Sequence, residues 1–262
     1  MKQFHNKVAL VTSASRGIGL ACACKLADLG AEVYMGVRRV KDTEVICDGY
    51  PDIKSRLHPV YFDATQEDSY ETLVQTIVAE SKHLDILVNN FGIGRPKEDL
   101  NLVDGSAKAF WEILELNLGS VYKLCKLVIP HMLKTGGSIV NISSIGGLIP
   151  DITRIGYGVS KAAVNNITQQ IALQYAAYGI RCNAVLPGLT ATDAALKNMP
   201  PEFVESFLSH VPMGRMGTPQ DIANGVAFLS SDAASYITGH ILDIAGGYGL
   251  GTPQYAQWRK NQ

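Results

Sequence analysis

Three side chains in one short stretch of the sequence have the chemistry of proton transfer. In residues 143–161, SSIGGLIPDITRIGYGVSK, Tyr157 and Lys161 are four positions apart and Ser144 comes thirteen before the tyrosine. Residues four apart share one face of a helix, so we expect the phenol and the ammonium to point together. A phenol has an ordinary pKa of about 10 and is a poor base at neutral pH. An ammonium roughly 5 Å away, at an effective dielectric of ~20, would stabilise the phenolate by about 3 kcal/mol, which favours proton exchange near neutrality.

The serine makes this stretch more informative than the tyrosine–lysine pair alone. Tyr-x-x-x-Lys pairs are common on protein surfaces, and most of them have no catalytic role. Ser144 follows the apolar run SIVNIS, and its hydroxyl could donate a hydrogen bond to a substrate oxygen. The three residues together are therefore more informative than the pair, and a surface ion pair is the alternative interpretation.

Seven short aliphatic runs have the composition of buried strands that could position these residues. They cover residues 7–12, 31–37, 58–63, 84–90, 138–144, 181–188 and 240–247, and amphipathic segments separate them. Strands that are apolar on both faces belong to parallel sheets covered by helices, and right-handed β-α-β connections give a doubly wound sheet. The sequence therefore predicts an α/β fold with a parallel seven-stranded sheet in a single domain over residues 1–262.

The stretch beyond the sixth predicted strand is the most irregular part of the sequence. Prolines recur at positions 200, 201, 212 and 219, and we expect one helix among them. A long insertion beyond the carboxyl end of a strand is where such sheets place a substrate lid. We therefore expect a lid over about residues 188–217.

The composition excludes several classes of protein. Hydrophobic residues make up 47% and charged residues 18% of the 262 positions, which indicates a packed globule. The formal net charge is −1, without a block of like charges, so we expect no nucleic-acid or membrane partner. No apolar run reaches the ~20 residues that span a bilayer, and the N-terminal run is too short for a signal peptide, which favours the cytoplasm. The five cysteines are scattered and form neither a disulfide framework nor a zinc motif.

The segment TSASRGIGL, residues 12–20, joins the first predicted strand to a helix and could bind a pyrophosphate. Gly17 and Gly19 would permit a tight turn and bring backbone N–H groups close to the ligand, where the helix N-terminus adds partial positive charge. The strict Gly-x-Gly-x-x-Gly fingerprint lacks its third glycine, because Cys22 stands there. An ordinary tight turn is therefore the alternative interpretation.

Basic residues near this turn indicate which dinucleotide would bind. NAD-binding sheets usually end their second strand with an acidic residue that holds the ribose 2′-hydroxyl, but Val37 stands here, followed by Arg38 and Arg39. Arg16 lies in the glycine turn itself. Guanidinium groups can bind a 2′-phosphate bidentately, so NADP(H) is favoured over NAD(H). Solvated surface arginines are the alternative.

The order and spacing of five motifs resemble the short-chain dehydrogenase/reductase family. The motifs are the glycine turn, LVNNFG (87–92), SIVNISS (138–144), YGVSK (157–161) and LPG (186–188), and the match covers residues 5–250. The resemblance implies a doubly wound Rossmann-like domain and hydride transfer between an alcohol carbon and a nicotinamide, without a metal. Two positions depart from the family: Ser13 replaces the first glycine of its turn motif, and Phe91 replaces the alanine of its Asn-Asn-Ala-Gly motif. Serine is disfavoured at positive φ, so the turn could be slightly altered.

The resemblance implies a role for each matching residue. Tyr157 is the general acid/base, Lys161 acidifies it and binds the nicotinamide ribose, and Ser144 orients the substrate oxygen. Asn117 holds a water that links the lysine to solvent. Asp63 binds the adenine, although without the family it would be read as a helix cap. The expected cofactor-binding residues are Ser13, Ser15, Arg16, Gly17, Ile18, Gly19, Arg38, Asp63, Ala64, Asn90, Gly92, Tyr157, Lys161, Pro187, Gly188, Thr190 and Thr192.

Apolar residues surround the expected catalytic group and suit a bulky apolar alcohol. Ile145 is expected to contact the substrate together with Ser144 and Tyr157. Ordinary core or subunit-interface packing is the alternative for many of the apolar side chains. The expected walls are Ile145, Leu148, Ile149, Ile152 and Ile155 in the catalytic stretch, and Leu189, Ala194, Ala195, Leu196, Met199, Phe203 and Phe207 in the lid.

Longer motifs resemble one group within the family, the bacterial NADP-dependent 7α-hydroxysteroid dehydrogenases that act on bile acids. These motifs are ISSIGGLIPDITRIGYGVSKAAVN, IRCNAVLPGL and AGGYGLGTPQY, the last of which runs into a short C-terminal extension over residues 250–262. The resemblance implies reversible oxidation of a 7α-hydroxyl to the 7-oxo form. The position and stereochemistry of that hydroxyl rest on the resemblance alone.

Other functions fit the same catalytic residues. A reductase of 3-oxoacyl-carrier-protein or of another ketone would use the same side chains, and so would a dehydrogenase of another hydroxysteroid position. An NADPH-binding sensor on the same fold is the non-enzymatic alternative, although such proteins commonly lack one of the three catalytic residues. The family resemblance also implies a homotetramer formed through helices near 106–134 and 157–178 and the last strand.

Overall fold

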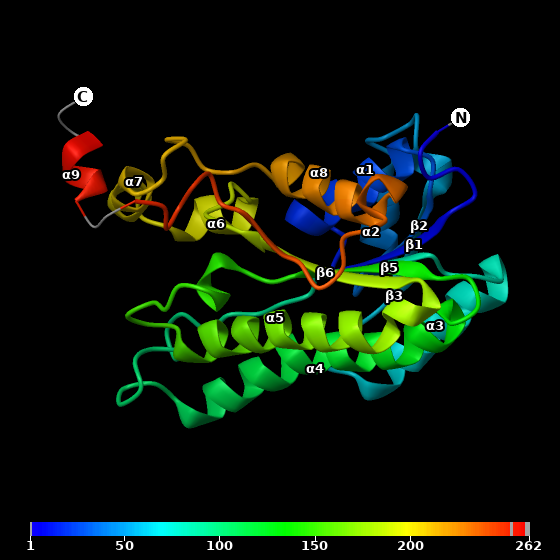
Figure 1. The fold of residues 1–262 in the computed structure, drawn as a ribbon, viewed down its shortest axis with the longest axis horizontal. Coiled ribbons are helices and arrows are strands. Elements are labelled where there is room, and N and C mark those ends of the chain that lie inside the picture. Colours follow the sequence, from blue (N-terminus) through cyan, green and yellow to red (C-terminus); the bar gives the residue numbers. More distant parts are fainter. Residues whose placement is uncertain (1, 252–253, 260–262) are drawn as a thin grey trace.

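A single parallel sheet forms the centre of the molecule (Figure 1). The computed structural model describes residues 2–251 and 254–259. The sheet has the strand order β3-β2-β1-β4-β5-β6-β7, with all neighbouring strands parallel, which confirms the predicted doubly wound seven-stranded sheet. The strands are β1 (Val8–Thr12), β2 (Glu32–Val37), β3 (Leu57–Tyr61), β4 (Ile86–Asn89), β5 (Gly137–Ile142), β6 (Ile180–Pro187) and β7 (Ile241–Ile244).

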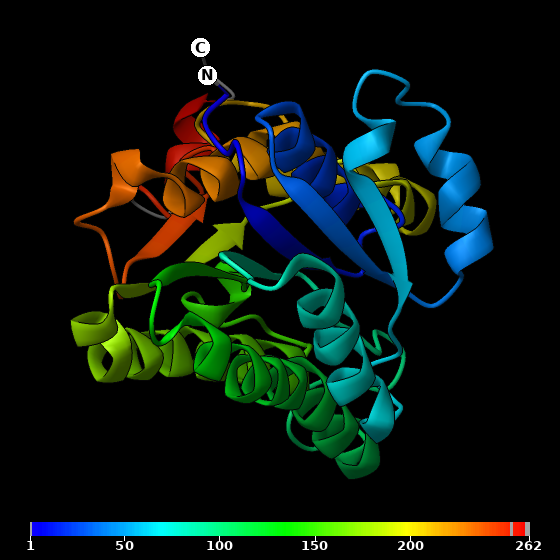
Figure 2. The same cartoon turned by 90° about the vertical axis from the view of Figure 1, so that its right-hand side faces the viewer.

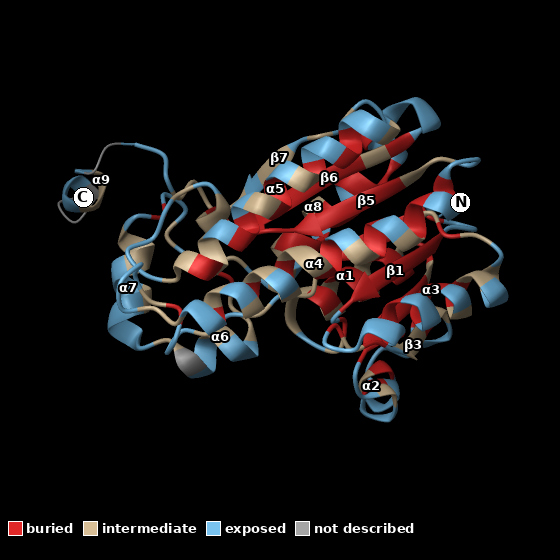
Figure 3. Ribbon diagram, turned by 90° about the horizontal axis from the view of Figure 1, so that it is seen from below, coloured by how far each residue is buried: buried red, intermediate tan, exposed pale blue. Residues whose placement is uncertain are grey.

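Helices cover both faces of the sheet, as Figure 2 shows from the end. The alternation of side chains along a strand supplies each face with its own core: Ala9 and Val11 of β1 pack with α1 and α8, whereas Val8 and Leu10 pack with α3, α4 and α5. Figure 3 shows the result as buried strands between helices that expose only their outer sides. The helices are α1 (Gly17–Asp28), α2 (Val40–Cys47), α3 (Glu67–Ser81), α4 (Ala107–Met132), α5 (Ile155–Tyr175), α6 (Asp193–Asn198), α7 (Pro201–Ser209), α8 (Pro219–Ser230) and α9 (Tyr255–Arg259).

The predicted lid contains two helices rather than the single helix expected from the sequence. Helices α6 and α7 follow β6 and lie at one end of the molecule, beyond the sheet (Figure 1). Pro200 separates them with an extended backbone, φ −61° and ψ 145°, and Pro201 begins α7. A residue before a proline is driven out of the helical region, and a proline fits the first helical position, so the Pro-Pro pair ends one helix and starts the next.

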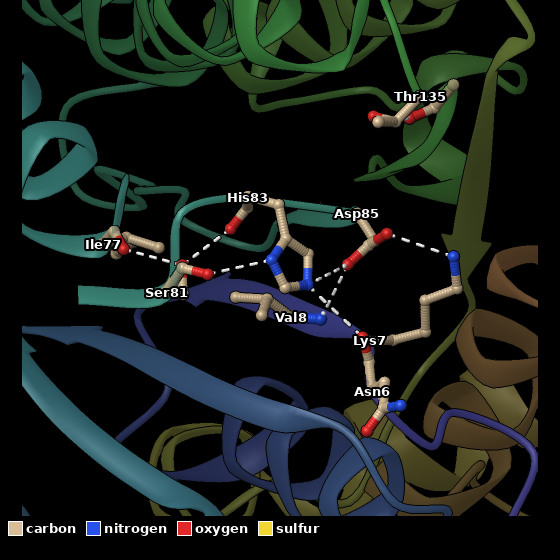
Figure 4. A network of polar contacts seen from close by, with 9 residues as sticks. Asn6, Lys7, Val8, Ile77, Ser81, His83, Asp85 and Thr135 are labelled. Atoms are coloured by element: carbon tan, nitrogen blue, oxygen red, sulfur yellow. Dashed lines mark hydrogen bonds and ion pairs between the residues drawn. The ribbon is translucent and has the colours of Figure 1, made fainter. Parts of the chain in front are cut away.

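A polar network closes the opposite, amino-terminal edge of the sheet (Figure 4). The Asp85 carboxylate accepts hydrogen bonds from the Val8 amide at 2.9 Å and from Lys7 Nζ at 3.1 Å. The His83 ring lies 3.3 Å from the same carboxylate, and its other nitrogen lies 2.9 Å from the Ser81 carbonyl oxygen. These contacts join the start of β1 to the segment that enters β4.

The two halves of the sheet diverge between β1 and β4, because the chain builds outward from β1 on one side and from β4 on the other. In open parallel sheets the crevice at the carboxyl ends of such a pair is where ligands bind. The glycine turn follows β1 and the segment 90–95 follows β4, so both reach this edge. The predicted cofactor and catalytic residues therefore belong to one side of the molecule. The single-domain boundaries stay a prediction.

Candidate active site

The carboxyl end of β5 and the start of α5 bring the three predicted proton-transfer residues together. Ser144 follows β5, and Tyr157 and Lys161 lie one turn apart on α5. The Lys161 Nζ lies 5.8 Å from the centroid of the Tyr157 ring. A Cβ built on Gly146 would lie 3.6 Å from Ser144 Oγ and 3.9 Å from Tyr157 Cε1, so the serine and the tyrosine flank the same glycine. All three side chains line one cleft of about 730 Å³.

Lys161 is held in a nearly closed environment. Its side chain is 4% exposed, and Nζ donates a hydrogen bond to the carbonyl oxygen of Ile142 at 2.9 Å. Burial lowers the pKa of Lys161, and the neighbouring Tyr157 phenol opposes that change in part. Burying a charged amine costs free energy of folding. An ammonium kept at this cost beside a phenol is typical of a functional site.

The hydroxyls of Tyr157 and Ser144 are available to a ligand. The Tyr157 hydroxyl has no hydrogen-bond partner among the described residues. Ser144 Oγ accepts a hydrogen bond from the Gly146 amide at 3.2 Å, which leaves its own proton free to be donated into the cleft. A donor and an ionisable phenol that face one space can bind a single oxygen atom between them.

Asn117 ties the segment after β4 to the catalytic helix. Its side chain is fully buried, and it accepts from the Ile93 amide at 2.7 Å while donating to the Ile93 carbonyl oxygen at 3.1 Å. It also donates to Ser160 Oγ at 2.9 Å. A Cβ on Gly92 would lie 3.2 Å from Lys161 Nζ and 3.6 Å from Asn117 Oδ1, so the asparagine lies near the lysine. The water link assigned to Asn117 stays a prediction.

The glycine turn after β1 has the geometry of an anion-binding loop. Gly17 has φ +55°, and a Cβ on Gly19 would lie 2.4 Å from the Ser13 carbonyl oxygen, so neither position fits another residue without strain. Ser13, at the family's first glycine, has φ +53°. Serine therefore adopts the left-handed conformation that glycine would take without steric cost. Asn90 holds the turn by donating to the carbonyl oxygens of Thr12 at 3.0 Å and Ser13 at 3.2 Å.

The arginines near the turn differ in their surroundings. Arg38 is exposed and forms no ion pair with any described residue, whereas Arg39 pairs with Asp42 at 3.3 Å. Arg16 is exposed at the N-cap of α1, where its side chain makes no capping hydrogen bond. Val37 at the end of β2 is buried. Arg38 and Arg16 therefore have no ion-pair partner among the described residues, whereas Arg39 is exposed and pairs with Asp42 at the surface.

The expected adenine residues follow β3. The Asp63 carboxylate accepts from the Thr65 amide at 3.0 Å and from its hydroxyl at 2.8 Å, and Gln66 rather than Asp63 is the N-cap of α3. Asp63 thus folds a local turn, and the helix-cap alternative for it is wrong. Ala64 is buried, and its carbonyl oxygen accepts from the Tyr70 hydroxyl at 2.9 Å.

The remaining expected cofactor residues lie at the end of β6 and in the segment that follows it, which reaches the glycine turn. A Cβ on Gly188 would lie 2.8 Å from Ala245 Cα, so only glycine fits there. Thr192 caps α6 by accepting from the Ala195 amide, and its methyl carbon would lie 3.3 Å from a Cβ on Gly17. The cleft brings together these members of the predicted set: Ile18, Asn90, Gly92, Ser144, Ile145, Tyr157, Lys161, Pro187, Gly188, Thr190 and Thr192.

The apolar walls agree with the prediction only in part. Ile145, Ile149 and six lid residues line the cleft: Leu189, Ala194, Ala195, Met199, Phe203 and Phe207. Leu148, Ile152 and Ile155 instead line a separate depression of about 370 Å³ on the other side of the segment 146–155, and Leu196 is exposed. Those four expected walls are absent from the cleft: the segment turns the first three toward its other side, and Leu196 lies on the solvent side of α6.

Some residues of the site were not expected from the sequence. The Tyr248 ring stacks on Phe207 with centroids 4.5 Å apart and forms part of the cleft wall, as do Arg154 and His210. Phe91 packs against the buried cluster that contains Val121, so it belongs to the core and not to the cleft. The motif AGGYGLGTPQY contains Tyr248, but no sequence signal indicated that its ring would meet Phe207 across the cleft wall.

The described residues contain no group of three or more histidine, cysteine, aspartate or glutamate side chains that could hold a metal ion. Helices of the described chain are also too short or too polar to cross a bilayer. All five cysteines are free, and burial raises the pKa of the Cys22 thiol to about 12. A buried thiol with a raised pKa forms little thiolate, so Cys22 serves as a packing group.

Known proteins resemble this chain over nearly its full length. A family profile described as "Enoyl-(Acyl carrier protein) reductase" matches residues 13–249. A 7alpha-hydroxysteroid dehydrogenase of Paraclostridium sordellii is 63% identical over 260 residues, covering 98% of this chain and 97% of the relative. The crystal structure of a short-chain type dehydrogenase/reductase from Mycobacterium marinum superposes with a TM-score of 0.88 at 30% identity, covering 95% of this chain and 98% of that one. The chain belongs to the short-chain dehydrogenase/reductase family.

A second relative agrees with the first. The 7alpha-hydroxysteroid dehydrogenase of Clostridium sardiniense is 50% identical over 262 residues, covering 98% of this chain and 99% of the relative. Short-chain dehydrogenases use an NAD(P) cofactor, and the site fits one: the left-handed turn after β1 leads into the N-terminus of α1, and Gly92, Pro187 and Gly188 line the cleft beside Tyr157 and Lys161. The resemblance to this family found in the sequence is therefore confirmed.

Proposed function

We propose that this short-chain dehydrogenase catalyses the reversible oxidation of the 7α-hydroxyl of a bile acid to the 7-oxo form, with NADP(H) as cofactor. The observation that supports this function most strongly is the 63% identity to a 7alpha-hydroxysteroid dehydrogenase, which extends over the catalytic stretch and the lid. The cleft agrees in character, since its described lining is mainly apolar and its volume of about 730 Å³ suits a ligand of steroid size.

In the oxidising direction, Tyr157 accepts the proton of the substrate hydroxyl as its phenolate. Ser144 donates a hydrogen bond to the same oxygen and holds it against the phenol. Lys161 stabilises the phenolate through its positive charge and keeps its position through the Ile142 carbonyl oxygen. The nicotinamide, when bound, supplies the hydride acceptor for the substrate carbon. The proton and the hydride together are the two hydrogens that the alcohol loses on becoming a ketone.

Residues of the glycine turn and of the end of β6 would hold the cofactor. The first amides of α1 and the left-handed turn at Ser13 and Gly17 would bind the pyrophosphate. The segment from Pro187 to Thr192 lies across the cleft and would bind the nicotinamide end. Asp63 would bind the adenine through the carboxylate oxygen that Thr65 does not use.

The preference for NADP(H) is supported by the two free arginines. Arg38 follows a buried valine instead of an acidic residue, and it has no ion-pair partner among the described residues. We expect Arg38→Ala to weaken NADPH binding by about 1–3 kcal/mol, as for a charge-assisted hydrogen bond, with little effect on NADH. Fluorescence titration of both cofactors measures this, and Arg39→Ala, whose guanidinium is engaged with Asp42, is the matched control. An unchanged NADPH dissociation constant would remove Arg38 from the phosphate site.

The substrate assignment is tested by following cofactor reduction with bile acids of different hydroxyl positions. Compounds with only a 3α-, 7α-, 7β- or 12α-hydroxyl are each offered with NADP⁺ and with NAD⁺. We expect turnover with the 7α compounds and NADP⁺. Activity confined to the 3α or 12α compounds would contradict the 7α assignment.

The carrier-protein alternative is less well supported by the structure. A carrier protein is acidic, so its reductase needs a basic surface beside the cleft. Arg154 lines the cleft, but its guanidinium lies on the Tyr157 ring, and Arg95, which follows the cleft residue Gly94, forms an ion pair with Glu112. A separate observation concerns the oligomeric state. The outer α4–α5 face exposes apolar side chains, among them Trp111, Val159 and Leu173, and they support the proposed homotetramer. Light scattering tests this oligomeric state.

A further inference from the structure

We propose that Asp99 is a positioning residue for Tyr157: it holds the first turn of α5 and thereby sets where the phenol lies in the cleft. The inference rests on the proposed function, because it requires Tyr157 to carry the proton. Asp99 lies in the loop between β4 and α4, which meets the N-terminal end of α5 (Figure 1).

Asp99 accepts three hydrogen bonds from the start of α5. Its carboxylate accepts from the Gly156 amide at 2.7 Å and from the Tyr157 amide at 2.9 Å. Its carbonyl oxygen accepts from the Arg154 amide at 3.0 Å. The side chain is 2% exposed, so these contacts are shielded from water. One residue, 58 positions before the tyrosine, thus binds the backbone of the tyrosine itself.

Helix α5 has no cap of its own. Its N-cap residue, Arg154, makes no side-chain capping bond, and the first turn contains no acidic residue. The first amides of a helix need partners from outside it, and a carboxylate there also stabilises the helix dipole. Helix α8 differs, since Thr218 and Asp221 form a capping box within it. Asp99 therefore caps α5 from a loop distant in sequence, whereas the cap of α8 comes from its own first residues.

The backbone at Arg154 shows that this junction is held under strain. Arg154 has φ +63°, a conformation that non-glycine residues keep only where the surroundings enforce it. Its guanidinium carbon lies 4.2 Å from the centroid of the Tyr157 ring and its side chain lines the cleft. The bond from the Arg154 amide to Asp99 thus also places a cation against the ring.

Lys161 and the carbonyl oxygen of Tyr157 are held by hydrogen bonds that do not involve Asp99. Lys161 Nζ is bound to the Ile142 carbonyl oxygen, and the Ser160 hydroxyl donates to the Tyr157 carbonyl oxygen at 2.7 Å. Loss of the Asp99 carboxylate would therefore loosen the first turn of α5 while Lys161 stays in place. A displacement of about 1 Å in a reacting group can cost roughly 100-fold in rate, whereas cofactor contacts elsewhere would persist.

Asp99→Asn tests this inference, because it keeps the size of the side chain but presents an amide donor to one of the two helix amides. We expect kcat to fall by about 10- to 100-fold, with the KM of the substrate and the NADPH dissociation constant within about twofold of wild type. Asp104→Asn is the matched control, since Asp104 lies exposed in the same loop and accepts from Asn101 rather than from α5. It should leave kcat unchanged.

A double-mutant cycle distinguishes positioning from general stabilisation. If Asp99 acts through the phenol, Asp99→Asn should not lower the residual activity of Tyr157→Phe any further. A purely structural role would lower the melting temperature and the fraction of enzyme that binds NADPH, and would reduce both backgrounds equally. Wild-type kcat in Asp99→Asn, or equal losses in both backgrounds, would overturn the inference.

Two further comparisons keep the result interpretable. Should Asp99→Asn fail to fold, Asp99→Ser, which can still accept from one amide, replaces it with the same expectations. Wild type and Tyr157→Phe are assayed in parallel. An inactive wild type, or a Tyr157→Phe variant with wild-type turnover, refutes the proposed function and this inference with it. An inactive Tyr157→Phe beside a fully active Asp99→Asn refutes the inference alone.

Discussion

The two edges of the central sheet are both rich in polar residues but use them differently. At the amino edge, Asp85 binds the Val8 amide and Lys7, and the His83 ring binds the Ser81 carbonyl oxygen, so these groups find partners in the protein (Figure 4). At the carboxyl edge, the Tyr157 hydroxyl has no partner among the described residues. It faces a cleft of about 730 Å³ instead.

This difference separates stability from function. A network whose polar groups satisfy one another strengthens the fold, and its loss costs free energy of unfolding. Polar groups that face a cleft without partners contribute nothing comparable to stability, and a buried ammonium such as Lys161 reduces it. Changes at the amino edge should therefore alter stability alone, whereas changes at the carboxyl edge should alter activity and can raise stability.

The largest effect is expected for Lys161→Met at the carboxyl edge. Loss of the ammonium beside Tyr157 should lower kcat by at least 100-fold, while removal of a buried charge should raise the free energy of unfolding at pH 7 by about 1 kcal/mol. The pKa of Lys161 in the folded protein lies below its ordinary 10.5. At pH values between the folded pKa and 10.5, the unfolded state therefore binds more protons than the folded state.

The free energy of unfolding of wild type should therefore rise with pH in that range. The difference in free energy of unfolding between Lys161→Met and wild type should become smaller. Urea denaturation from pH 7 to pH 10, with initial rates at pH 7, checks both parts of this prediction. A Lys161→Met variant that is less stable than wild type at pH 7 would show that the ammonium supports the fold.

A smaller effect of opposite kind is expected for Asp85→Ala at the amino edge. The substitution leaves the Val8 amide and the Lys7 ammonium without their partner, so the free energy of unfolding should fall by about 2–3 kcal/mol. The kcat of the folded enzyme should stay within about twofold of wild type. Asp52→Ala, at an exposed turn position, is the control and should change neither quantity. A large drop in kcat of Asp85→Ala at an unchanged free energy of unfolding would contradict the claim that the amino edge supports stability and not activity.

The smallest effect is expected for Ser13→Gly in the turn after β1. Ser13 has φ +53°, which glycine adopts without steric cost, so the substitution should stabilise the protein by about 0.5–1 kcal/mol. Ser15→Gly is the control, because Ser15 does not have a positive φ and should only gain unfolded-state entropy, with a small loss of stability. Thermal denaturation of the two variants should shift the midpoint in opposite directions.

Local sequence patterns predicted most of the fold. The strand expected over 181–188 is observed as Ile180–Pro187, because a run that is apolar on both faces is recognised without knowledge of its neighbours. The strand expected over 240–247 ends earlier, at Ile244, since Gly246 and Gly247 take positive φ and turn the chain away. The lid was described less well, because the Met199-Pro200-Pro201 sequence divides one expected helix into two.

The site was predictable where its residues are close in sequence and not where the fold joins distant ones. Tyr157 and Lys161 share one helix and Ser144 follows the preceding strand, which ends at Ile142, so the sequence already showed these residues close together. Asp99 lies in the polar stretch PKEDLN, which reads as a solvated loop, and only the fold places it under α5. Tyr248 becomes a cleft wall only through its stacking on Phe207.

The most direct test of the catalytic proposal is the turnover of Tyr157→Phe beside its affinity for NADPH. The substitution removes the hydroxyl oxygen and keeps the ring, on which the Arg154 guanidinium lies. We predict that kcat falls by several orders of magnitude, as expected for loss of the proton-transferring group, while the NADPH dissociation constant changes little. Near-normal turnover of Tyr157→Phe with a bile acid would contradict the assigned proton transfer.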